Sequence, residues 1–91
     1  MSSVVRAEVL EALKRAEARG GKKVRVIIGL RAGGSTSAIK EALARSGVTS
    51  YRREAESFLA VELSRQQVLP LGKLKQHVSS IWLDRPVSAA G

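Results

Sequence analysis

His77 is the single histidine of this chain, and it lies near the end of a predicted helix. It could act as a general base only beside a nucleophilic serine and a supporting carboxylate. Nothing in the sequence places such partners around it, so a histidine at the surface or at a helix end is the preferred interpretation. We therefore expect no enzymatic activity and no catalytic residue.

The glycine-rich stretch Gly33-Gly34-Ser35-Thr36 precedes a predicted helix. Such a turn could bind an anion, but it lacks the spaced glycines and the lysine of a phosphate loop, so we interpret it as a helix entry. One histidine and no cysteine cannot form the usual Cys/His zinc site. An acylphosphatase-like activity would need an asparagine, which the sequence lacks. We expect no cofactor and no metal.

A lone carboxylate, Asp84, follows the last predicted strand in the stretch Ile81-Trp82-Leu83-Asp84-Arg85-Pro86-Val87. A carboxylate held at this point could bind the N-terminus of a helix, where N–H groups lack partners and carry a partial positive charge. A local turn cap or an ion pair with Arg85 would explain the same residue. Both interpretations stay open at the level of the sequence.

Length and charge limit the class of protein. The 91 residues form one domain, near the lower end of what buries a self-sufficient core. A formal net charge of +8, from 16 Lys and Arg against 8 Asp and Glu, favours acidic partners without identifying one. No apolar run approaches the roughly 20 residues that span a bilayer, and the N-terminus lacks the apolar core of a signal peptide. We expect a soluble chain without membrane contact, monomeric when free.

Periodicity predicts the elements that position these residues. An amphipathic helix covers residues 3–19 and stops at two glycines, and a second helix covers 36–46 and stops at Gly47. Runs rich in β-branched residues predict four strands. These strands cover residues 23–30, 48–54, 57–63 and 80–83.

A third helix is predicted after the third strand, where Ser64 and Gln67 fit a capping box. Pro70 removes a backbone donor inside this segment and could divide it into a first turn and a helix that begins near the proline. The apolar stripe of the helix consists of Val68, Leu71, Leu74 and Val78.

The order of elements after the first helix is strand, helix, strand, strand, helix, strand. It predicts an α+β, ferredoxin-like βαββαβ fold with an antiparallel sheet and two helices on one face, preceded by an additional N-terminal helix. Residues 1–21 form the amphipathic helical extension, 22–87 the ferredoxin-like domain and 88–91 a flexible tail. This arrangement leaves one face of the sheet open.

Strand alternation separates the two faces of the predicted sheet. The face opposite to the helices carries a group of largely apolar residues that includes all three aromatics of the chain: Ile27, Tyr51, Phe58, Ala60 and Trp82. A contiguous patch of this kind marks a contact site. The alternative is that the N-terminal helix folds over this face and makes it ordinary core.

Three stretches in combination resemble the propeptide domain of subtilisin-like serine proteases and the related free-standing inhibitors of these enzymes. They are "VRVIIGLR" from Val24, "SFLAVELS" from Ser57 and "VSSIWLDRPV" from Val78, and the resemblance covers residues 23–87. It implies a propeptide-like domain that acts as an intramolecular chaperone of its own protease and then as its tight inhibitor. It also implies a secreted or extracellular location.

In that family the open sheet face packs on two parallel helices of the protease, acidic residues cap these helices, and the C-terminal tail lies in the substrate cleft. Asp84 matches the acidic position. Trp82 and Leu83 stand where acidic residues are frequent in the family. Pro86 sets an extended backbone, and the small tail after it could add as a strand to the cleft; a flexible end is the alternative. This tail consists of Val87, Ser88, Ala89, Ala90 and Gly91.

RNA binding is the main alternative, because RNA-recognition domains share this topology and carry aromatics on the open face of a basic sheet. The third strand, however, offers Phe58-Leu59-Ala60-Val61 in place of Gly-aromatic-Gly/Ala-aromatic, and the first strand has Arg25 and Ile27 where a stacking ring is expected. Nucleic acid is therefore the less favoured partner. A small protein-interaction module is a further alternative.

Overall fold

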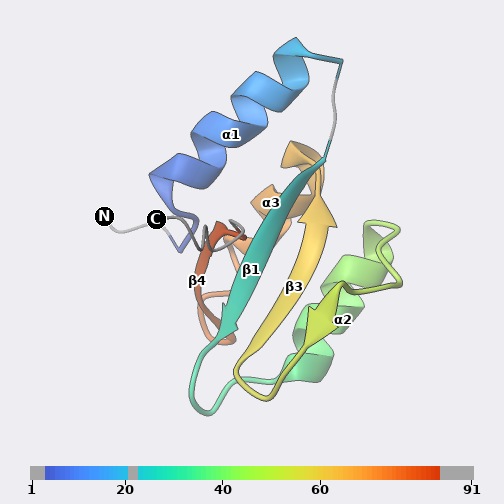
Figure 1. Ribbon diagram of the computed structural model, residues 1–91. Helices are drawn as coiled ribbons and strands as arrows, with labels where there is room; N and C mark the ends of the chain where they lie inside the picture. Colours follow the sequence, from blue (N-terminus) through green and yellow to red (C-terminus); the bar gives the residue numbers. More distant parts are fainter. Residues whose placement is uncertain (1–3, 21–22, 85–91) are drawn as a thin grey trace, which may run out of the picture.

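A computed structural model describes residues 4–20 and 23–84 of the chain. The elements follow the order α1 (Ala7–Ala18), β1 (Val24–Leu30), α2 (Thr36–Arg45), β2 (Arg53–Glu54), β3 (Phe58–Leu63), α3 (Arg65–Leu71) and β4 (Val78–Leu83). The four strands form one antiparallel sheet in the order β2-β3-β1-β4 (Figure 1). The fold is therefore α+β with a split βαββαβ arrangement after an N-terminal helix, as the sequence predicts.

Local sequence explains where α2 and α3 begin. The Ser35 hydroxyl accepts a hydrogen bond from the Ala38 N–H over 3.2 Å and caps α2. Ser64 and Gln67 form the predicted capping box of α3, in which the Ser64 N–H donates to Gln67 Oε1 over 2.9 Å. Gly47, with φ of 87°, takes the left-handed conformation that ends α2.

The predicted strand 48–54 is much shorter in the structure. Val48 is buried in the core directly after α2, and its N–H donates to the Leu43 carbonyl over 2.8 Å. Residues 49–52 then follow the rim of the sheet as a loop. The Arg52 N–H donates to the Ala60 carbonyl over 2.7 Å, and the strand pairing with β3 consists of Arg53 and Glu54. The result is an edge strand of two residues.

The predicted stripe of α3 is correct only in its first half. The helix runs through Pro70 and ends at Leu71, and residues 72–77 form turns, so no second helix begins near the proline in this described part of the chain. Val78 belongs to β4, where it pairs with Leu30. Val78 follows Leu74 by four residues, which is the spacing of a helical stripe, but it is the first residue of β4.

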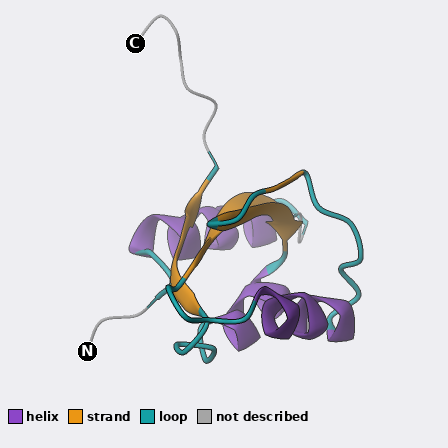
Figure 2. Ribbon diagram, turned by 90° about the horizontal axis from the view of Figure 1, so that it is seen from below, coloured by secondary structure: helices purple, strands orange, loops and turns teal. Residues whose placement is uncertain are grey.

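One hydrophobic core joins all three helices to one face of the sheet. α1 packs against β1, β4 and α3, and its buried Val9 and Leu13 lie in the same core as Ile28 and Ile81. Figure 1 shows α1 beside the start of β1, and Figure 2 shows the helices in purple around the strands. The first helix therefore shares the packing of the domain that follows it.

The segment before α1 extends the sheet beside β4. Val5 forms a parallel bridge with Ile81. The Arg6 N–H donates to the Ile81 carbonyl over 3.0 Å, and the Ile81 N–H donates to the Val4 carbonyl over 2.7 Å. These bonds cover part of the outer edge of β4, which would otherwise present unpaired backbone groups.

Gly34 lies against the turn that carries His77. The Arg31 N–H donates to the His77 carbonyl over 2.8 Å, and the Ser35 N–H donates to His77 Nδ1 over 2.9 Å. A Cβ at position 34 would lie 2.7 Å from the Cα of His77. His77 therefore holds the loop that leads into α2 through two hydrogen bonds. It lies in a turn, whereas the sequence predicts it near the end of a helix.

Replacing Gly34 with alanine should destabilise the domain by about 2 kcal/mol, because the new methyl group meets backbone that cannot move aside freely. Urea unfolding followed by circular dichroism measures this change. Ala32→Ser, at an exposed position of the same loop, is the matched control and should stay within about 0.5 kcal/mol of the wild type. Equal midpoints for the two variants would contradict the close approach at Gly34.

Candidate functional site

The face of the sheet opposite to the helices carries Ile27, Phe58, Ala60 and Trp82, which we call the open face. The strand register places Ile27 between Ala60 on β3 and Trp82 on β4. Among the described residues, Ile27, Phe58 and Trp82 are half-buried and lie outside the core cluster and the side chains packed against it. The structure thus brings these predicted residues together on one surface.

The first helix leaves the open face uncovered, because its buried side chains point into the core on the other side of the sheet. At the outer edge of β4, Glu8 of α1 and Arg6 before it line a cavity of about 450 Å³ together with Ser80 and Trp82. The alternative that α1 converts this face into core is therefore wrong.

The Trp82 indole lies directly against the backbone of β1. A Cβ on Gly29 would come within 2.8 Å of Cζ3 of the indole, so glycine at this position makes room for the ring. Gly29 also pairs with Phe58 on the opposite strand. The two aromatic residues of the open face therefore flank one glycine.

Ala60 forms the floor of the open face. It is 0% exposed and pairs with Ile27 on one side and Arg53 on the other. Its small side chain allows the larger neighbours to close over it. Ala60 thus supports the surface and is not itself accessible in the free domain.

The Asp84 carboxylate lies at one end of the open face. Its Oδ1 is 3.5 Å from Nη2 of Arg53, and the side chain is 14% exposed. The Arg53 guanidinium also lies 5.7 Å from the centre of the Phe58 ring, within the range of a cation–π contact. Arg53 reaches Asp84 from β2, at the opposite edge of the sheet, and no local pattern in the sequence indicates this contact. Arg85, the partner considered from the sequence, lies outside the described residues.

Tyr51 is not part of the open face, and its predicted position is wrong. It packs against the core, with the Nζ of Lys40 on α2 lying 5.4 Å from the ring centre. Lys40 in turn pairs with Glu54, and the hydrogen bond to this carboxylate raises the pKa of Lys40 above its ordinary value. Strand alternation fails for Tyr51 because residues 49–52 form a loop.

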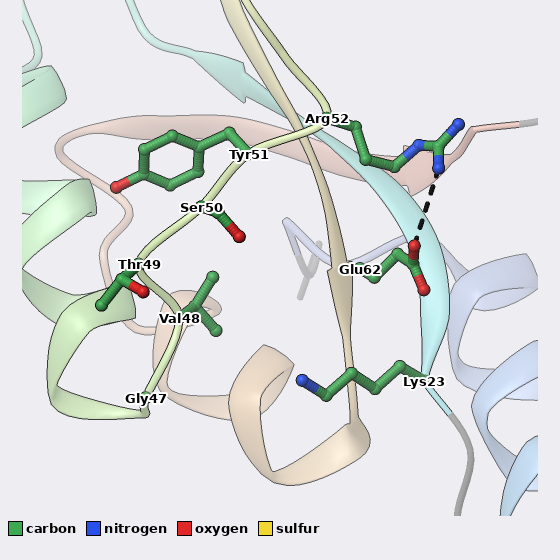
Figure 3. Close-up of a pocket in the computed structure, with 8 residues that line it drawn as sticks. All are labelled: Lys23, Gly47, Val48, Thr49, Ser50, Tyr51, Arg52 and Glu62. Carbon is green, nitrogen blue, oxygen red and sulfur yellow. Dashed lines mark ion pairs between the residues drawn. The ribbon is translucent and has the colours of Figure 1, made fainter.

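A polar hollow of about 340 Å³ adjoins the open face beyond Glu62 (Figure 3). The loop residues Thr49, Ser50 and Tyr51 form one side of it, and Lys23 lies on another. Arg52 and Glu62 form an ion pair here, with Nη1 and Oε1 3.6 Å apart. Sequence periodicity gave no indication of this hollow, because it depends on the path of an irregular loop.

Several predicted features fall outside the described residues or concern other kinds of site. The tail residues Val87, Ser88, Ala89, Ala90 and Gly91 lie beyond the described ranges. Within residues 4–20 and 23–84, no three acidic or histidine side chains gather as a metal site, and no helix has the length and apolar character to cross a membrane.

Comparisons with protein-family models, curated proteins and solved structures find no match to this chain.

Proposed function

We propose that this protein is a propeptide-like domain that binds a subtilisin-like serine protease, assists its folding and inhibits it without catalysis. The observation that carries this proposal is the open face, where Ile27, Phe58 and Trp82 lie uncovered by α1 and next to Asp84. Half-buried aromatic residues around a packed floor are typical of the centre of a protein interface. The resemblance of three stretches to protease propeptides suggests the class of partner.

The chemistry of Asp84 fits the docking of this face on helices. A carboxylate beside helix N-termini stabilises the contact by roughly 0.3 to 2 kcal/mol. In the free domain Asp84 is held by Arg53, whose side chain is 61% exposed. An ion pair with one exposed partner contributes little, about 0 to 1 kcal/mol, so Asp84 can exchange Arg53 for helix N–H groups at small cost.

Inhibition assays with the purified chain test the proposal. Residual cleavage of a chromogenic peptide by a panel of subtilisin-type proteases is measured against the concentration of the domain. We expect competitive inhibition of at least one enzyme at submicromolar concentration. Lack of inhibition at micromolar concentration, together with salt-sensitive binding of single-stranded RNA, would favour the RNA-binding alternative.

Removing Val87 to Gly91 should weaken inhibition by about tenfold or more, because an extended tail in the substrate cleft adds main-chain hydrogen bonds. Equal thermal unfolding of the truncated domain and of the full chain is the control for folding. An unchanged inhibition constant would exclude the tail from the mechanism.

A further inference from the structure

Three cations without a described ion-pair partner gather at one end of the molecule. Arg15 lies in the last turn of α1, Arg19 caps this helix, and Lys23 precedes β1. All three are exposed, and within the described residues none of them forms an ion pair. We call this group the cationic rim.

The cationic rim surrounds a groove. Arg15, Arg19 and Lys23 line a cavity of about 400 Å³ between α1 and the start of β1, together with the half-buried apolar residues Ala12, Ala16 and Val24. Its floor is therefore apolar and its margin positively charged. A ligand that combines an aliphatic stem with a carboxylate matches both features.

Lys23 also connects this groove to the polar hollow beside the open face. Figure 3 shows the Lys23 side chain extending along the hollow, while the Glu62 carboxylate points toward Arg52. Arg52 lies 3.6 Å from Glu62, so the carboxylate that lines this hollow already has a partner. The positive charge of Lys23 therefore remains available to an incoming acidic group.

The strand register places Lys23, one member of the cationic rim, next to the end of β1 that lies beside Asp84. Val24 pairs with Leu63 and Arg25 with Glu62, and the Asp84 N–H donates to the Arg25 carbonyl over 3.1 Å. A protein that covers the open face as far as Asp84 would therefore also reach Lys23, the member of the cationic rim that lines both the polar hollow and the groove.

We infer that the cationic rim receives carboxylate side chains of the docked protein, so that the partner is acidic beside its docking site. This inference rests on the proposed function for the class of partner. Cations at the margin of an interface mainly raise the association rate and suppress partners of like charge. Nucleic acid is the less fitting ligand, because the groove offers no aromatic ring on which a base could stack.

Two variants with the same change in formal charge test the rim. The rim variant is Arg15→Glu/Arg19→Glu/Lys23→Glu. The control variant is Arg31→Glu/Lys73→Glu/Lys75→Glu, at exposed positions near the opposite end of β1. Arg15→Gln/Arg19→Gln/Lys23→Gln serves as the milder variant if the charge reversal prevents folding, which thermal unfolding reports.

Stopped-flow association with an acidic subtilisin-type protease is the first readout. At low salt the rim variant should associate about tenfold more slowly than the control variant, and the difference should shrink at about 0.5 M salt, where charges are screened. Equal rates for the two variants would overturn the inference while inhibition itself persists. Equal rates would show that the association rate depends on the net charge of the domain and not on the position of the cations.

Titration with a glutamate-rich hexapeptide, followed by amide chemical shifts, is a readout that needs no protease. Shifts should concentrate around residues 12–19 and 23–25 and disappear in the rim variant. If they do so and no protease is inhibited, the inference stands and the proposed function fails. Stronger binding of a single-stranded RNA hexamer than of the peptide at the same residues would overturn the carboxylate as the ligand.

Discussion

Replacing Trp82 with glutamate should weaken inhibition of a subtilisin-like protease by about 100-fold or more, roughly 3 kcal/mol of binding free energy. The ring lies on the edge strand β4 of the open face, beside Ile27, against Gly29 and outside the core. A carboxylate in its place would be buried without a partner in the complex, whereas in the free domain it can reach water. The free domain should therefore lose less stability than the complex. Inhibition constants and urea midpoints of the same preparations measure the two effects.

Tyr51→Glu is the matched control for Trp82→Glu. Tyr51 packs on the helix side beside Lys40, so its replacement should lower stability and leave inhibition by the folded domain nearly unchanged. If Tyr51→Glu weakened inhibition as much as Trp82→Glu at equal folded fraction, the open face would not be the docking surface.

Leu13→Ala should destabilise the whole domain by about 3 kcal/mol, within the range for a buried leucine that leaves a cavity. Leu13 is 1% exposed and shares one core with the strands, so α1 and the sheet should unfold in a single transition. Lys14→Ala, on the exposed side of the same helix, should change the free energy of unfolding by less than about 0.5 kcal/mol. A loss of helical signal that leaves the unfolding of the sheet unchanged would show that α1 is only an appended element.

Most of the fold could be predicted because sequence and local structure agree in the long elements. Alternation of Val26 and Ile28 with Arg25 and Ile27 defines the two faces of β1, and both strands that pair with it repeat the pattern. Ser64 and Gln67 mark the start of α3 through hydrogen bonds over one turn. Such signals act over a few residues and can be read from the chain directly.

The predictions failed where distant parts of the chain determine the structure. Strand pairing with β3 begins at Arg53, preceded by one backbone hydrogen bond from Arg52 to Ala60, so residues 49–51 follow the rim as a loop and Tyr51 lies beside Lys40 of α2. The Arg53–Asp84 pair joins the first and last strands of the sheet order. Neither contact has a local signal, since both depend on how the finished sheet brings its edges together.

The hydrogen bonds between Val4, Arg6 and Ile81 also bear on how the protein is made. During translation Val4 leaves the ribosome long before Ile81. The segment before α1 can therefore form its hydrogen bonds with β4 only after nearly the whole domain has been synthesised. Contacts between such distant parts of a chain slow folding. The fold can therefore close only after β4 has been synthesised.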